Sequence, residues 1–187
     1  MTACGVAFKE WAVVCEALAR GRQTIILRKG GIHEGREGFR VAHSQFWLLP
    51  TKFHASPDAL VPEASELMAA AETMNKADTF LVRHFAVVER VIELAREEEA
   101  LALAGLHLWS ESTVRQRFHY KNPGLFCLAV RVFATNEVHG ITDTPAIAGC
   151  RSWVELPTAL STDGLTPAVD DDRFAEMLSA VQTRLTS

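Results

Sequence analysis

The chain has 187 residues, of which 48% are hydrophobic and 22% charged, and its formal net charge is −4. This length fits one compact domain, and the composition excludes a disordered, collagen-like or low-complexity chain. The sequence has no run of 18 or more apolar residues. It also lacks the basic start and unbroken apolar core of a signal peptide, so we expect a cytoplasmic protein with no membrane segment.

The first part of the chain fits two patterns over residues 8–18. Apolar side chains recur there at helical spacing, and Gly21 suits the position just after a helix end; these side chains are Phe8, Trp11, Cys15 and Leu18. The same segment also suits a strand that forms a hairpin with residues 23–29. Both alternatives stay open. Residues 23–29 (QTIILRK) are the clearest strand of the sequence, with apolar side chains on both faces.

The middle of the chain predicts strands and helices in alternation. A short strand over 46–49 should end at Pro50, because proline lacks the N–H that a ladder needs. An acidic helical segment follows at about 58–76. Residues 79–94 are rich in β-branched and aromatic side chains, which favours a strand over a helix, and residues 95–104 then favour a helix.

The last third predicts a capped helix, two strands and a terminal helix. Ser110 or Ser112 should cap a short helix. Strands follow at 125–134 and 152–156, and an amphipathic helix covers about 171–185. Together these elements predict a single α+β domain over residues 1–187, with a mixed β-sheet covered by helices.

Positive charge is concentrated in the first third of the chain. Residues 1–54 carry eight Lys or Arg against four Asp or Glu. Arg28 and Lys29 end a predicted strand and lead into Gly30 and Gly31, whose bare backbone amides can form an anion-binding nest beside two cations. Adjacent residues of a strand face opposite sides, so we expect Arg28 or Lys29 to line a concave, positively charged surface.

Two further residues complete the predicted binding set. Thr51 follows the FWLLP segment, and Arg117 belongs to a basic and aromatic stretch over residues 107–120 that suits stacking and pairing with nucleotides. A local patch of this kind would bind nucleic acid or a nucleotide through its phosphates.

A catalytic alternative uses histidines and glutamates. His43 and His54 flank FWLLP and share a site if the chain turns sharply at Pro50. The protein would then be a phosphohydrolase acting on a nucleotide-like substrate, with His43 or His54 as the base and Glu34 or Glu99 at a metal.

The sequence contains no P-loop, no GxSxG elbow and no CxxC pair among its four cysteines. We therefore favour a non-catalytic, phosphate-recognising module without a metal or other cofactor.

Several strings along the chain resemble a bacterial family of uncharacterised proteins, the domain of unknown function 1802. They are FKEWAVVCEAL, ILRKGGI, FWLLPTKFH, VRVF and GCRSWVEL. Members of that family occur joined to a restriction-endonuclease-like catalytic domain. The resemblance therefore implies a role in restriction or defence, with the nuclease as a separate partner protein.

The order of elements is also similar, more weakly, to that of Nudix hydrolases. Aligning on Gly105 and Leu106 keeps Glu99 in place, but puts Ala102 and Leu103 where the two metal-binding glutamates belong. Mg²⁺ on a diphosphate needs several carboxylate oxygens. This likeness implies a Nudix-like fold without its catalytic box.

Overall fold

The structure, a computed structural model, describes residues 3–29, 42–52, 57–149 and 151–186. These residues form one eight-stranded mixed sheet and five α-helices, which confirms the α+β class. The strands are β1 (Ala3–Trp11), β2 (Ile25–Arg28), β3 (Gln45–Thr51), β4 (Asn75–Lys76), β5 (Thr79–Leu94), β6 (Leu125–Thr142), β7 (Trp153–Ser161) and β8 (Thr166–Pro167). The helices are α1 (Ala12–Ala19), α2 (Ser65–Glu72), α3 (Glu97–Ala102), α4 (Glu111–His119) and α5 (Asp171–Thr186).

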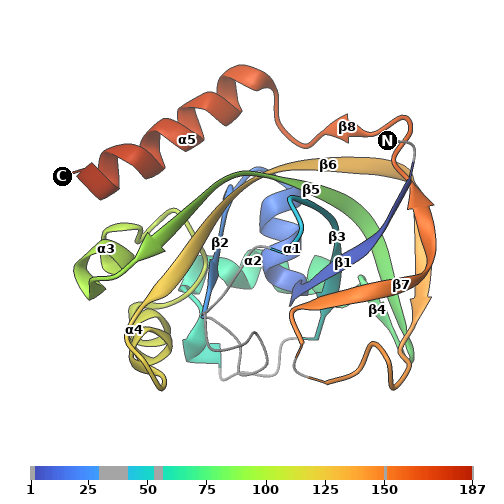
Figure 1. Cartoon of the computed structure of the whole chain (residues 1–187), viewed down its shortest axis with the longest axis horizontal. Helices are drawn as coiled ribbons and strands as arrows, with labels where there is room; N and C mark the ends of the chain where they lie inside the picture. Colours follow the sequence, from blue (N-terminus) through green and yellow to red (C-terminus); the bar gives the residue numbers. More distant parts are fainter. Residues whose placement is uncertain (1–2, 30–41, 53–56, 150, 187) are drawn as a thin grey trace.

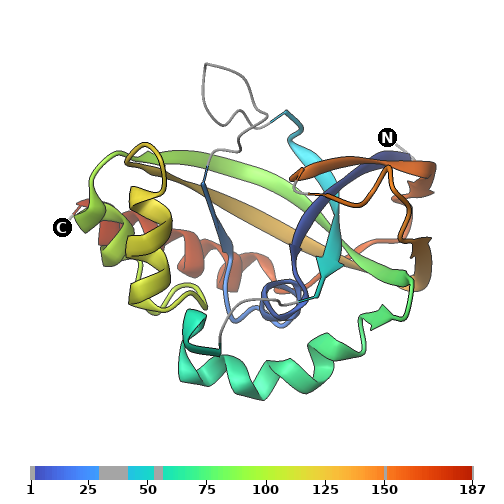
Figure 2. The same cartoon turned by 90° about the horizontal axis from the view of Figure 1, so that it is seen from below.

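The sheet curves around helix α1. Its main strands follow the order β2-β6-β5-β3-β1-β7, and β4 and β8 pair with β5 and β6. The long strands β5 and β6 arch over α1 in Figure 1, and six of the eight residues of α1 are buried. Helix α2 lies beside α1, as the view from below shows (Figure 2). Alternate residues of β1 are divided between two apolar clusters, with Phe8 on the α1 side and Ala7 in the other cluster.

Residues 8–18, whose sequence fits both a helix and a strand, contain the end of a strand followed by a helix. β1 ends at Trp11 and α1 begins at Ala12, so the strand and the helix are consecutive. The hairpin prediction is wrong, because β2 pairs with β6 and not with β1. Gly21 follows the helix with a φ of 62°, and its N–H donates to the Leu18 carbonyl oxygen (3.1 Å). This left-handed glycine ends the helix as expected.

Strand β3 continues through Pro50 to Thr51, so the expectation that Pro50 ends the strand is wrong. β3 pairs with β5 only as far as Trp47, whereas its parallel pairing with β1 continues to Thr51. Beyond Trp47, none of the described strands pairs with the other edge of β3. A proline is tolerated there, because the missing N–H costs no ladder hydrogen bond.

Strand β5 and the cap at Ser110 agree with the sequence, β6 and β7 continue beyond the predicted 125–134 and 152–156 to Thr142 and Ser161, and one helix is shorter than expected. Residues 79–94 form strand β5, and Ser110 caps α4, its hydroxyl accepting a hydrogen bond from the Thr113 N–H (3.4 Å). The acidic segment contains two 3-10 turns and α2, which ends at Glu72; a turn follows, and β4 then occupies Asn75–Lys76. The helical prediction for 58–76 therefore extends too far.

Helix α5 packs on the opposite side of β5 and β6 from α1 (Figure 1). Its Phe174 and Val181 are buried. The Arg131 guanidinium lies over the rings of Phe133 (5.7 Å) and Phe174 (5.0 Å) and pairs with Asp171 at the start of the helix. None of the described helices is both long and apolar enough to span a membrane.

Candidate functional site

Arg28 joins two strands that are not neighbours in the sheet. Its Nη2 donates to the Lys9 carbonyl oxygen at 2.8 Å, and its Nη1 lies 3.4 Å from Glu10 Oε2. Its guanidinium also lies 4.5 Å above the centre of the Phe8 ring. The end of β2 is thereby fixed to the end of β1.

Glu10 is a buried carboxylate at this junction, with only 3% of its surface exposed. Burial raises its pKa, while Arg28, the Trp11 N–H and Arg117 act in the opposite direction. The Thr51 hydroxyl donates to the Glu10 carbonyl oxygen at 3.0 Å. The structure therefore brings Arg28 and Thr51, two of the predicted binding residues, into contact with Glu10, and the charge of Arg117 also acts on its carboxylate.

Lys29 points to a different part of the molecule. Its ammonium donates to the carbonyl oxygens of Phe118 (2.9 Å), Gly124 (2.8 Å) and Asn122, at and just beyond the C-terminal end of α4. An ammonium has three N–H groups, and these contacts occupy them. Partial burial lowers its pKa. Lys29 thus holds a helix end, and we do not place it in an anion site. Gly30 and Gly31 lie outside the described residues.

Two members of the catalytic alternative, His43 and Glu99, are among the described residues, and the structure does not bring these two together. The His43 ring packs edge-on against Trp153 of β7, with 5.2 Å between ring centres. Glu99, on α3, accepts hydrogen bonds from the Arg96 N–H (3.0 Å) and Nε (2.9 Å), which lower its pKa. His43 and Glu99 therefore have separate partners on separate elements. His54 and Glu34 lie outside the described residues.

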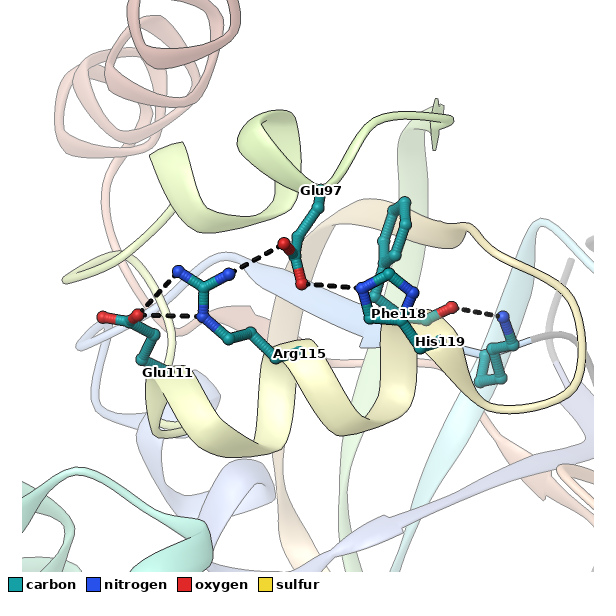
Figure 3. Close-up of polar contacts among 6 residues, drawn as sticks. Glu97, Glu111, Arg115, Phe118 and His119 are labelled. Atoms are coloured by element: carbon teal, nitrogen blue, oxygen red, sulfur yellow. Dashed lines mark hydrogen bonds and ion pairs between the residues drawn. The ribbon is translucent and has the colours of Figure 1, made fainter.

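Much of the basic and aromatic stretch is engaged within the fold. Figure 3 shows Glu97 of α3 between Arg115 and His119 of α4. Its carboxylate oxygens lie 2.7 Å from Arg115 Nη1 and 3.0 Å from His119 Nε2, and Glu111 pairs with Arg115 as well (2.9 Å). These ion pairs connect the two helices, so neither Arg115 nor His119 is held ready for a ligand.

A pocket of about 360 Å³ lies near the ends of β1 and β3, beside Lys9 and Thr51. Its volume is within the usual range for small-ligand sites. The pocket is lined by Lys9, Thr51, Lys52, Asn75, Lys76, Ala77, Thr79, Phe80, Asp143, Ala148 and Gly149. These lining residues include three lysines and one aspartate, so the pocket is cationic.

Lys9 is the buried cation of this pocket, at 9% exposure, and its Nζ donates to the Gly149 carbonyl oxygen (3.0 Å). Lys52 and Lys76 are exposed. Among the described lining residues, Thr51 is the one that the sequence had singled out. The sequence offers one indication at Lys9, which is a basic residue in a mainly apolar strand. Lys52 directly follows Thr51, but no sequence motif connects the three lysines.

The curved mixed sheet around a central helix, with a cationic pocket at the strand ends, defines a single-domain α+β protein with a candidate anion site. The chain belongs to the family described as domain of unknown function DUF1802, whose model matches residues 7–180. No curated protein matches the chain.

The chain is also similar to crystal structures of the ASCH protein from Zymomonas mobilis. Two of these structures are mutant proteins, with TM-scores of 0.43 and 0.44 at 12% identity; they cover 93% of this chain and 94% and 96% of those chains. A third, described without a mutation, has a TM-score of 0.40 at 11% identity and covers 93% of each chain. Likenesses this low carry no argument about function.

The Nudix likeness is not supported. The helix that would carry the catalytic box is α3, which spans only Glu97–Ala102. Its Glu97 and Glu99 pair with arginines, as described above.

Proposed function

We propose that this protein is a non-catalytic module that binds the phosphate groups of a nucleic acid or a nucleotide. The observation that carries the proposal is the pocket at the strand ends, where the described lining residues include Lys9, Lys52 and Lys76 and one carboxylate, that of Asp143. Lysine ammonium groups bind phosphate as point charges, and a concave wall strengthens their field.

The rest of the pocket suits the other parts of a nucleotide. Phe80 offers an aromatic side chain for a base, and Thr79 offers a hydroxyl. The contacts of Arg28 with Glu10 and the Lys9 carbonyl fix the end of β1. We infer that they hold Lys9 in position and act on the ligand only through it.

The test measures binding of labelled single-stranded oligonucleotides and of nucleoside triphosphates across a series of salt concentrations. The double variant Lys52→Ala, Lys76→Ala should weaken binding to oligonucleotides of every sequence alike. It should also reduce the slope of log affinity against log salt by about 0.7 for each phosphate that the variant no longer neutralises.

A matched control loses the same charge elsewhere, through Arg22→Ala and Arg173→Ala. These arginines pair at the surface with Glu66 and Glu176, outside the pocket. An equal loss of affinity in both double variants would contradict the proposal, because it would show a response to net charge alone. Turnover of the triphosphates with Mg²⁺ would favour the phosphohydrolase instead.

We do not extend the proposal to a nuclease partner or to restriction, because none of the described residues points to either.

A further inference from the structure

We infer that the pocket accepts a terminal phosphate group, a phosphomonoester, in preference to the internal phosphodiesters of a strand. This inference rests on the proposed function and narrows its ligand to a phosphorylated strand end or a nucleoside monophosphate.

The first argument is charge. Among the described residues of the lining, three lysines and one aspartate give a formal charge of +2. A phosphomonoester carries −1.5 to −2 at pH 7, whereas each internal diester carries only −1.

The second argument is the shape of the pocket, whose walls are tied together on three sides. The bond from Lys9 Nζ to the Gly149 carbonyl joins β1 to the segment that precedes β7. The pairing of Lys76 with Thr79 closes the β4–β5 hairpin. The Asp143 N–H donates to the Asp78 carbonyl (2.9 Å) and joins the end of β6 to that hairpin. These bonds hold the described part of the lining in place, so its cations form one fixed cluster before a phosphate group binds.

The pH dependence of binding follows from the ligand. The charged lining groups are Lys9 from β1, Lys52 after β3, Lys76 from β4 and Asp143 after β6, and the lining formed by described residues includes no histidine. A phosphomonoester gains its second charge near pH 6. Affinity for it should rise by up to about tenfold between pH 5 and 7.5, while affinity for a diester stays level.

The experiment compares one oligonucleotide with a 5′-phosphate, with a 3′-phosphate and with hydroxyl groups at both ends, together with a nucleoside monophosphate. At least one phosphorylated end, or the monophosphate, should bind about tenfold more tightly than the hydroxyl form. Inorganic phosphate should compete for the site. Lys52→Ala, Lys76→Ala should abolish this preference.

A variant that should bind more tightly provides a further check, because a misfolded protein would bind less tightly. Asp143→Asn removes the negative charge from the lining and should tighten binding of the phosphorylated ligand several-fold.

If the hydroxyl form binds as tightly as the phosphorylated forms and is still weakened by the lysine variant, the terminal-phosphate inference is wrong and the proposed function stands. If the lysine variant changes no binding at all, both are wrong.

Discussion

His107 should make the protein sensitive to acid. Its side chain is buried, at 6% exposure, and Nδ1 accepts a hydrogen bond from the Trp109 N–H at 3.1 Å. That acceptor role requires the neutral ring with its proton on Nε2. Burial lowers the pKa of His107 to about 4, from 6.5 in an unfolded chain.

The sign of the effect follows from this lowered pKa. Between pH 6.5 and 4, His107 is protonated in the unfolded chain but stays neutral in the folded chain. The stability that His107 contributes above pH 6.5 is therefore lost as the pH falls through 4. A difference of about 2.5 pKa units corresponds to about 3 kcal/mol in the free energy of unfolding, of which about 2 kcal/mol should be lost by pH 4.5.

Denaturant unfolding at pH 7 and pH 4.5 measures this loss in the wild type and in His107→Asn. Asparagine places an amide oxygen near the position of Nδ1, so an acceptor for the Trp109 N–H is retained while the titration is removed. The variant should lose about 2 kcal/mol less than the wild type on acidification. Equal losses in the two chains would refute the argument.

Three further outcomes follow from other contacts. Lys29→Met removes the donor from three carbonyls and should lower the free energy of unfolding by about 1–3 kcal/mol while nucleotide binding is unchanged; unchanged stability in denaturant would contradict its role at the end of α4. Glu10→Gln should flatten the pH dependence of stability above pH 4.5. Burial raises the pKa of Glu10, so wild-type stability declines as the pH rises through that raised value; parallel curves for the two chains would count against this. Truncation after Asp171 removes the buried Phe174 and Val181, and should lower the melting temperature and expose surface that binds a hydrophobic dye; an unchanged melting temperature would mean that α5 is not part of the core.

The sequence could predict the elements whose signals are local. The β-branched content of residues 79–94 predicted β5, and the cap at Ser110 depends on neighbours within three residues. The change from β1 to α1 after Trp11 has no such signal, because the apolar pattern fits both conformations on either side of it. Tertiary packing decides between them: alternate side chains of β1 face two clusters, whereas α1 is enclosed by one.

The site was harder to predict, because its members meet through long-range contacts. Arg28 was identified as a cation at a strand end, but its partner Glu10 lies on a strand that does not pair with β2. Lys29 looked equally suitable. Its true partners, the carbonyls near the end of α4, are brought to it only by the fold. The pocket lysines come from three separate elements, and periodicity within one element cannot show that they meet.

The pairing of β1 with β7 determines when the molecule can finish folding. Ala3 lies opposite Ser161 and Phe8 opposite Trp153, so the two strands come from distant parts of the chain. During synthesis this edge of β1 therefore stays unpaired until β7 has left the ribosome. Contacts between such distant residues also form slowly, since a long loop must close first. Until then the newly made chain has an open strand edge, where chaperones and unwanted strand pairing would compete.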